Sequence, residues 1–233
     1  MGEHAQKRII RKLDLELVLS KVAAQPTPQV QLEQYTISPS VAANMLYIAA
    51  YTNNDIADKT VLDLGSGTGR LSLGAAFLGA ESVVGVDVDW LAIKTAVQNS
   101  INVGLAGCVE WINCDINALV GTVDTVLQNP PFGVQTREAD RAFLIKALEI
   151  GTRIYSLHNH PETDSKLTGK LKASGLLQVE PSPFLERFVE KNGGIVMAVY
   201  AMLMTIPKMF EFHTKDRHDF VVDCYVIEKL SGK

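Results

Sequence analysis

The chain has 233 residues, of which 47% are hydrophobic and 21% are charged, and its formal net charge is −4. This length and composition fit a single domain over residues 1–233 with a substantial core, and they argue against disorder. The acidic balance also argues against a protein that coats nucleic acid without selection, although a local basic patch could still hold a phosphate backbone.

The sequence also indicates a compartment. No apolar run approaches the roughly 18 residues that a membrane-spanning helix needs, so no membrane partner is expected. The stretch from Met1 to Lys12 is charged and lacks the apolar core of a secretory signal. Cys108, Cys114 and Cys224 are odd in number and show no C-x-x-C spacing. We therefore expect reduced thiols, no metal site and a cytoplasmic location.

The first part of the chain predicts two helices. Residues 4–24 carry apolar residues at helical spacing. Ser38-Pro39 is typical of an N-cap followed by a proline in the first turn, and it predicts a helix that reaches about Tyr51. Together these segments predict an N-terminal helical extension over about residues 4–52.

The core, from about residue 58 to residue 233, alternates apolar strands with helical stretches. Such alternation is typical of βαβ units with right-handed crossovers and a parallel sheet. The last two strands are joined by a short basic segment, which predicts an antiparallel hairpin closing one edge of the sheet. We therefore predict an α/β fold with a Rossmann-like, doubly wound, mostly parallel seven-stranded sheet and helices on both faces. The expected strands are 60–64, 82–89, 109–115, 123–129, 152–158, 195–207 and 219–230.

A glycine-rich turn follows the first expected strand, in the stretch D-L-G-S-G-T-G from Asp63 to Gly69. Its glycines, Gly65, Gly67 and Gly69, permit a tight turn and let a ligand approach the backbone closely. Such a turn serves NAD, FAD and other nucleotides equally well, so alone it indicates only a nucleotide-like ligand.

Acidic residues end the next two expected strands. Asp87 lies about 20 residues beyond the glycines, where a carboxylate can accept hydrogen bonds from ribose hydroxyls. Asp115 could accept a hydrogen bond from an adenine amino group, beside the backbone of Ile116. Each aspartate alone could equally be an exposed strand end or a cap. Together with the glycine turn, they lie where open α/β sheets bind ligands.

The fourth expected strand ends in Q-N-P-P-F-G, from Gln128 to Gly133, on the same rim. The two prolines make this turn stiff, because each fixes φ and lacks an N–H, and the second holds the first extended. Asn129 and Phe132 would therefore leave the strand end in a set geometry.

These segments together resemble the S-adenosylmethionine-dependent methyltransferases that modify exocyclic amines or amides. The specific element is Asn-Pro-Pro-aromatic, which most other methyltransferases lack. The resemblance implies that Asn129, Pro130, Pro131 and Phe132 are the catalytic residues. The Asn129 side-chain oxygen and the Pro130 carbonyl would accept the hydrogens of the acceptor nitrogen, and Phe132 would stack on its flat group. Ordinary core packing is the alternative for Phe132.

A closer resemblance extends from about residue 8 to residue 228. The stretches LEQYTISPSVAANMLY, VLDLGSGTGRLSLGAAFLGA, NPPFG, DRAFLIKALE, YSLH and FEFHTK are similar, in this order, to the small single-domain enzymes that methylate one adenine N6 in small-subunit ribosomal RNA. This resemblance implies S-adenosylmethionine as the cofactor and RNA as the substrate. The eukaryotic members of this family pair with a small zinc-binding activator protein that shields an apolar sheet edge. The resemblance therefore implies that this chain could have such a partner. Residues 161–180 look like an insertion relative to this family.

The same resemblance implies the site residues, including a Leu-Glu-Gln-Tyr segment that lines the cofactor pocket. The predicted cofactor-binding residues are Gln34, Tyr35, Thr36, Asp63, Gly65, Ser66, Gly67, Thr68, Gly69, Arg70, Asp87, Val88, Asp115, Ile116 and Asn129. The candidate substrate contacts are Phe132, His158, His213 and Lys215. For the two histidines, the alternative is a strand-end or loop position in which the ring bonds the backbone.

Three other functions are alternatives to RNA adenine methylation. Protein glutamine N5-methyltransferases usually carry tyrosine where Phe132 stands, and often an extra N-terminal helical domain. DNA adenine methyltransferases more often carry aspartate in place of Asn129 and usually have a separate target-recognition domain. The third alternative is a non-catalytic, cofactor-binding scaffold subunit, and the intact Gly65, Gly67, Gly69, Asp87 and Asn129 argue against such a decayed site. We therefore expect an S-adenosylmethionine-dependent N-methyltransferase that acts on adenine N6 in RNA.

Overall fold

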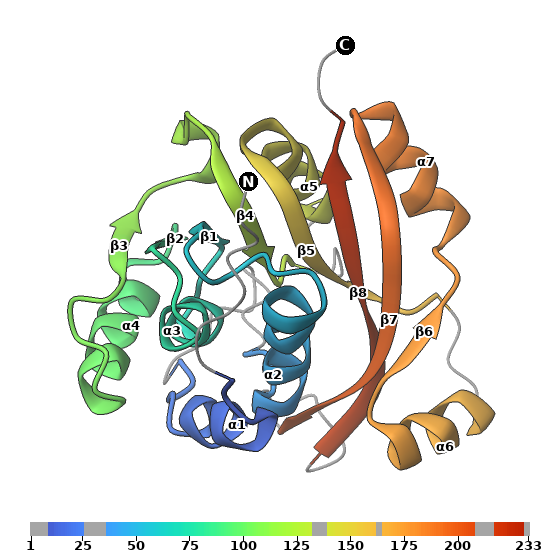
Figure 1. Cartoon of the computed structure of the whole chain (residues 1–233), viewed down its shortest axis with the longest axis horizontal. Coiled ribbons are helices and arrows are strands. Elements are labelled where there is room, and N and C mark those ends of the chain that lie inside the picture. The colour runs from blue at the N-terminus through green and yellow to red at the C-terminus, as the bar shows by residue number, and fades with distance from the viewer. Residues whose placement is uncertain (1–8, 26–35, 132–138, 162–164, 208–216, 231–233) are drawn as a thin grey trace.

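The computed structural model describes residues 9–25, 36–131, 139–161, 165–207 and 217–230 (Figure 1). These residues form one eight-stranded sheet with helices on both faces, in the strand order β3-β2-β1-β4-β5-β8-β7-β6. The strands are β1 (Thr60–Leu64), β2 (Ser82–Asp87), β3 (Glu110–Asn113), β4 (Val123–Gln128), β5 (Gly151–Asn159), β6 (Leu177–Val179), β7 (Gly194–Pro207) and β8 (Arg217–Lys229). The helices are α1 (Lys12–Ser20), α2 (Pro39–Tyr47), η2 (Ile48–Thr52), α3 (Arg70–Phe77), α4 (Trp90–Asn102), η3 (Ile116–Ala118), α5 (Ala139–Ile150), α6 (Ser165–Ser174) and α7 (Pro183–Lys191).

The first five strands form the parallel half of the sheet. β1 lies between β2 and β4, and its last residue, Leu64, pairs with Val86 of β2 and with Gln128 of β4. The strand order reverses between β1 and β4, so their carboxyl ends form the topological switch point at which open α/β sheets bind ligands. The carboxyl ends of β1 and β4 thus lie side by side at one rim of the sheet, where the sequence predicted a ligand site.

The C-terminal hairpin is antiparallel, as predicted, but it lies inside the sheet. β8 pairs with β5 on one side and with β7 on the other. The short strand β6 pairs with Val199–Ala201 of β7 and takes the edge position. The sheet therefore has eight strands where seven were expected. Three residues between Gly175 and Pro181 are too few to show the alternation by which a strand is recognised in a sequence.

The N-terminal helices confirm the predicted cap. The Ser38 hydroxyl accepts a hydrogen bond from the backbone N–H of Val41 at 3.3 Å, and Pro39 is the first residue of α2. The helix continues as η2, one π-helical turn that ends at Thr52. α1 begins at Lys12 and ends at Ser20, inside the predicted range.

Two cores sandwich the sheet. On one face, α1, α2 and α3 bury a cluster that includes Leu19, Leu46 and Tyr155. On the other face, α5 and α7 bury a second cluster around Leu144 and Val189. Within the described parts of the chain, no helix is long and apolar enough to cross a membrane.

Candidate functional site

Residues at the ends of neighbouring strands meet at the switch point. Gly65, Asp87 and Asn129 each belong to, or directly follow, the end of a strand, one row beyond the paired residues of β1, β2 and β4. Asp115 stands at the same rim, because Asn113 of β3 is in register with Asp87. The structure therefore brings together the four strand ends that the sequence singled out.

The glycine turn adopts a conformation that favours glycine. Gly65, Gly67 and Gly69 have φ values of 74°, 53° and 89°. At Gly65 a Cβ would also lie 2.8 Å from Cε1 of Phe143 in α5. At Gly67, by contrast, no atom of the described residues lies within 4 Å of the position that a Cβ would take. The turn is therefore packed at its start and open at its middle, where a ligand can approach the backbone.

Polar groups beside the open part of the turn retain capacity for a ligand. Asp87 Oδ2 accepts a hydrogen bond from the Gly67 N–H at 2.7 Å, and Oδ1 accepts one from the Asp89 N–H at 2.9 Å. Each carboxylate oxygen has a second lone pair. The buried Ser66 hydroxyl has no hydrogen-bond partner among the residues that the structure describes. Burial raises the pKa of Asp87, while the bonds from Asp89 and Gly67 act in the opposite direction.

Asp63 connects the strand before the glycine turn to the helix after it. It is buried in β1 and accepts hydrogen bonds from the backbone N–H and the hydroxyl of Ser72 in α3. Burial raises the pKa of Asp63 to about 7. These contacts join β1 to α3 on either side of the turn, so the carboxyl group fixes the angle at which the chain leaves the strand.

The Arg70 guanidinium faces the N-terminal segment. Arg70 is the first residue of α3, is 8% exposed, and donates to the carbonyl oxygens of Leu19, Val22 and Ile37. Leu19 and Val22 precede residues 26–35 in the chain, and Ile37 follows them. One buried side chain thus fastens both flanks of that segment to the glycine turn.

A second set of buried polar contacts strengthens this attachment. Asn99 of α4 accepts a hydrogen bond from the Ala23 N–H and donates to the Ala23 and Thr68 carbonyl oxygens, each at 3.0 Å. Gln25 donates to Asp89 Oδ2 at 3.2 Å. The N-terminal strap, defined here as residues 22–25, therefore lies on the turn and on α4. Sequence reasoning missed Asn99 and Gln25, because neither belongs to a local motif.

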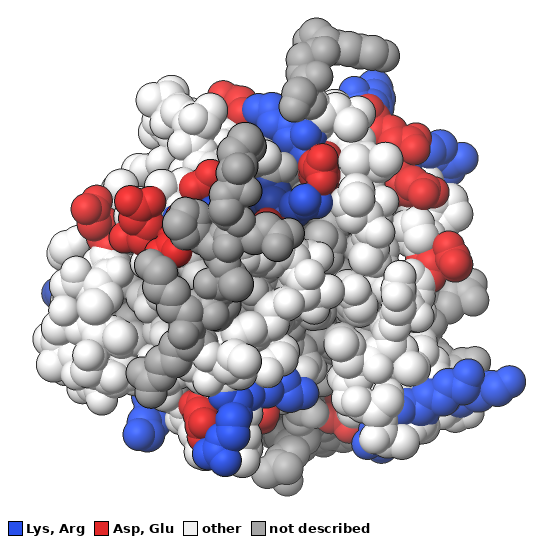
Figure 2. All heavy atoms as spheres, in the orientation of Figure 1, with Lys and Arg blue, Asp and Glu red and all other residues white. Residues whose placement is uncertain are grey.

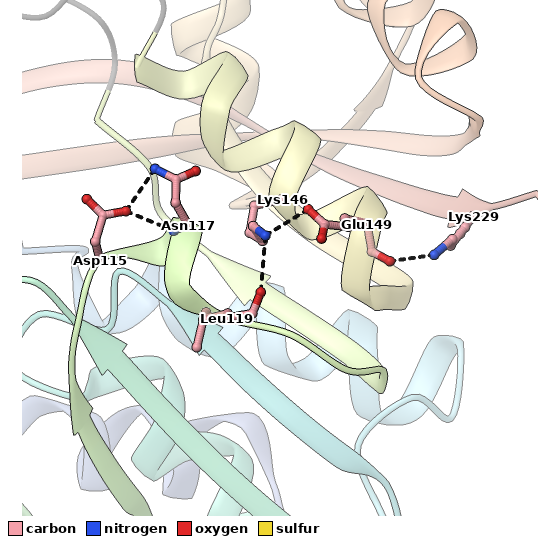
Figure 3. Close-up of polar contacts among 6 residues, drawn as sticks. All are labelled: Asp115, Asn117, Leu119, Lys146, Glu149 and Lys229. Atoms are coloured by element: carbon pink, nitrogen blue, oxygen red, sulfur yellow. Dashed lines mark hydrogen bonds and ion pairs between the residues drawn. The ribbon is translucent and has the colours of Figure 1, made fainter.

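Asp115 is exposed at the rim beyond β3. Its Oδ1 accepts hydrogen bonds from the backbone N–H of Asn117 at 2.8 Å and from its side chain at 2.9 Å, so the carboxylate caps η3 (Figure 3). Ile116 packs against the core beneath α5, and Val88, on the next strand end, is 56% exposed. These three predicted residues thus line the rim on the β2–β3 side of the glycine turn.

A lysine in α5 fixes the segment that follows η3. Lys146 donates to the Leu119 carbonyl at 3.1 Å and forms an ion pair with Glu149 at 2.7 Å (Figure 3). Lys229 of β8 donates in turn to the Glu149 carbonyl at 2.6 Å. α5 is thereby tied to the rim segment and to the antiparallel half of the sheet.

The Asn-Pro-Pro turn rests on a buried row of polar side chains. Gln128, the last residue of β4, donates to the Ser156 hydroxyl at 2.8 Å, and that hydroxyl also hydrogen-bonds His158 Nε2 at 2.8 Å. Asn129 Oδ1 and Pro130 are buried where β4 ends. The row connects β4 to β5 directly beneath the turn, so it restricts the turn's position.

His158 contributes to this support as a neutral ring. It is 4% exposed, and burial lowers its pKa to about 4, so it is uncharged at neutral pH. Its ring meets that of Tyr225 edge-on, with centroids 5.4 Å apart. Its burial places it within the sheet rather than on the surface that a phosphate backbone would reach.

Several predicted residues fall outside the described part of the chain: Gln34, Tyr35, Phe132, His213 and Lys215. Thr36, which follows them, is half-buried. Within the described ranges, no group of three or more His, Cys, Asp or Glu side chains is arranged to hold a metal ion. Two aromatic residues were missed, Phe143 against Gly65 and Trp111 against Gly69; their role follows from packing and leaves no motif.

Comparison with known proteins gives a consistent result. The family model of the methyltransferase small domain matches residues 42–150. The chain is 38% identical over 217 residues to the rRNA N(6)-adenosine-methyltransferase METTL5 of Danio rerio, over 90% of this chain and 95% of that protein. It is 37% identical to the MJ0284 protein of Methanocaldococcus jannaschii, over 95% and 96% of the two chains.

A solved structure has the same fold and extent. PH1948 from Pyrococcus horikoshii, described as a candidate RNA methyltransferase, is 34% identical, with a TM-score of 0.79 over 96% of this chain and 100% of that one. The match to METTL5 covers 90% of this chain, and the match to PH1948 covers 96% of it. The chain therefore belongs to the family of S-adenosylmethionine-dependent methyltransferases that includes the rRNA N(6)-adenosine-methyltransferase METTL5.

Proposed function

We propose that this chain transfers a methyl group from S-adenosylmethionine to the exocyclic N6 of an adenine in small-subunit ribosomal RNA. The observation that carries the proposal is the placement of Gly67, Asp87 and Asn129 at the ends of three neighbouring strands. The similarity to METTL5 over most of both chains supports the choice of RNA adenine. A ribosomal RNA substrate would also place the chain in the cytoplasm.

The groups around the glycine turn fit an adenosyl cofactor. Asp87 can accept hydrogen bonds from ribose hydroxyls with the lone pairs that Gly67 and Asp89 leave unused. The Ser66 hydroxyl and the open face of Gly67 offer a second contact zone. Asp115 would accept from the adenine amino group. When bound, S-adenosylmethionine supplies an electrophilic methyl group on a sulfonium.

The Asn-Pro-Pro turn would align the acceptor nitrogen. The lone pair of adenine N6 is delocalised into the ring, so the amine is a weak nucleophile. Acceptance of its two hydrogens by the Asn129 side-chain oxygen and the Pro130 carbonyl would draw electron density onto nitrogen and fix its direction, in a site with little water. We assign Phe132 to stacking on the base. The row of Gln128 and His158 keeps the strand end in place.

A transfer assay with tritiated methyl groups tests the proposal. Small-subunit RNA, a release-factor-like protein and DNA are offered side by side, and the products are digested. Label in N6-methyladenosine from RNA is the expected result. Label in protein glutamine would favour the amide alternative, since the same acceptor geometry suits a side-chain amide. If RNA, protein and DNA all remained unlabelled, the non-catalytic scaffold subunit would be the remaining alternative.

Arg70→Ala is expected to weaken cofactor binding, because it removes the donor to three buried carbonyls that flank residues 26–35. A buried acceptor left without its donor costs about 1–3 kcal/mol, so a fall in melting temperature should accompany the loss. Calorimetry with S-adenosylmethionine and thermal melting check both effects. Arg187→Ala, on the exposed face of α7, is the matched control. An Arg70→Ala protein with wild-type affinity would contradict the attachment.

We further propose that a small zinc-binding activator protein covers the β3 edge. β3 is the outer strand on this side of the sheet (Figure 1). Its residue Ile112 is 40% exposed. α4 presents Trp90, Val97 and Ile101 at helical spacing, with exposures of 55%, 41% and 55%. At the other side of the sheet, the hairpin strand β7 is covered at its centre by β6.

The β3 assignment predicts a selective defect. Ile101→Glu should weaken capture of a zinc-binding activator protein in a pull-down and leave the melting temperature of the isolated chain unchanged, because the side chain is exposed. Ile195→Glu, at the exposed start of β7, serves as the control and should retain capture. If Ile195→Glu lost capture while Ile101→Glu retained it, the interface would instead lie at the β7–β8 hairpin.

A further inference from the structure

The helix α6 packs on β6 and β7, at the end of the sheet that also holds the acceptor turn (Figure 1). β5 runs parallel to β4, so its carboxyl end reaches the rim that holds Asn129, and α6 begins soon afterwards. His158 of β5 is in register with Asp223 of β8, which is in register with Ala201 of β7. Directly paired residues project from the same face of a sheet. Leu171 of α6 packs on Ala201, so α6 covers the face that carries His158.

The packing of α6 directs its lysines to solvent. Leu171 is buried and Leu167 packs beside it, so these leucines form the inward side of the helix. Lys166, Lys170 and Lys172 are exposed, and none of them forms an ion pair with another described residue. Basic side chains are visible in Figure 2 at the position that α6 occupies in Figure 1.

Nearby described carboxylates are already engaged. Asp223 accepts from His160 at 2.8 Å, and Asp219 accepts from the Thr205 hydroxyl at 2.7 Å. α6 itself contains no acidic residue. Glu162 and Asp164 precede it in the sequence, outside the described residues. The helix α6 thus carries three lysines and no acidic residue, on a chain whose net charge is −4.

Lys166 and Lys170 form a row suited to a phosphate backbone. Side chains four residues apart on a helix have Cβ atoms about 5–6 Å from each other, so the two ammonium groups can meet neighbouring phosphates of one strand. β7 ends and β8 begins at this rim. An acidic protein surface could also meet these lysines, but their position at the rim to which β4 and β5 carry the acceptor turn favours the substrate itself.

We infer that α6 binds the phosphate backbone of the RNA substrate at the rim that holds the acceptor turn. This inference rests on the proposed function and deepens it, because it assigns a role to residues 161–180, the segment that interrupts the expected pattern. Phosphate contacts position a nucleic acid without reading its sequence. α6 would therefore raise the affinity for RNA without taking part in methyl transfer.

The test compares two double variants with equal loss of charge. Lys166→Gln with Lys170→Gln removes the row on α6. Lys59→Gln with Lys191→Gln removes two lysines at the opposite rim, where β1 and β7 begin. For the α6 variant we expect KM for RNA to rise about tenfold, with kcat and S-adenosylmethionine affinity unchanged. The slope of log K against log salt should fall by about 1.4, at ~0.7 for each lost contact to a single strand.

Three outcomes are distinguishable. If the α6 variant and the opposite-rim control keep wild-type KM and salt dependence, the inference is overturned while the proposed function stands. If both variants lose affinity equally, the effect is one of net charge, and the assignment to α6 is again overturned. If the wild-type chain does not methylate RNA, the proposed function itself fails. Melting curves of both variants, which should match the wild type, exclude unfolding as the cause.

Discussion

Replacement of Asn129 by alanine should abolish methyl transfer and leave S-adenosylmethionine binding close to that of the wild type. In the proposed mechanism the Asn129 side-chain oxygen accepts a hydrogen from the acceptor nitrogen, and this contact gains strength as positive charge develops there. Loss of a comparable electrostatic contact in other enzymes lowers kcat by about 10²–10³. We expect a loss of at least this order, measured with tritiated methyl groups at saturating RNA.

Asn129→Asp separates the loss of the oxygen from a disturbance of the turn. Aspartate keeps an acceptor oxygen at nearly the same place, so this variant should retain measurable turnover. Asn102→Ala, on the exposed face of α4, controls for loss of an asparagine and should keep the wild-type rate. Thermal melting should accompany the assay, because Asn129 Oδ1 is buried. Turnover by Asn129→Ala near the wild-type rate would refute the aligning role.

Asp87→Ala should weaken S-adenosylmethionine binding by about 10–100-fold, the range that corresponds to about 1.5–3 kcal/mol for hydrogen bonds to a charged group. The carboxylate has two tasks, since it holds the Gly67 N–H at 2.7 Å and retains lone pairs for ribose hydroxyls. Asp87→Asn keeps one acceptor and should lose less. Glu81→Gln, just before the other end of β2, removes the same charge and should bind normally. Calorimetry decides between these expectations, and wild-type affinity in Asp87→Ala would contradict the ribose assignment.

The same carboxylate predicts a pH dependence. Burial raises the pKa of Asp87, so the group takes up its proton at a higher pH than an ordinary aspartate. The protonated acid is a weaker acceptor for ribose hydroxyls. Cofactor affinity should therefore decline on acidification through this raised pKa, and Asp87→Asn should show a flatter profile. An identical profile in the two proteins would assign the titration to another group.

The parts of the site that sequence reasoning recovered are those encoded within a few residues. The glycine turn, Asp87 and the Asn-Pro-Pro turn each follow a strand and carry their own pattern, and register alone then brings them together. The fold class followed from the same alternation of strands and helices. Strand β6 was not predicted, because only its three residues Leu177–Val179 pair with β7 and so short a strand shows no alternation.

Residues whose role depends on distant partners could not be assigned from sequence. The carbonyls that Arg70 contacts lie 33 to 51 positions away in the chain. A basic residue at the start of a helix after a glycine turn suggests a ligand contact, and only the fold shows where its guanidinium goes. His158 is similar, because its neutral state follows from its burial in the sheet beside Tyr225.

Phe143 connects the glycine turn to α5, the helix that follows the Asn-Pro-Pro turn. Its ring occupies the volume that any side chain at position 65 would need, and it belongs to the helix that continues the chain after the Asn-Pro-Pro turn. Because protein interiors are close-packed, a side chain added at position 65 would have to displace this ring. A substitution of Gly65 would therefore disturb both the glycine turn and the helix that follows the Asn-Pro-Pro turn.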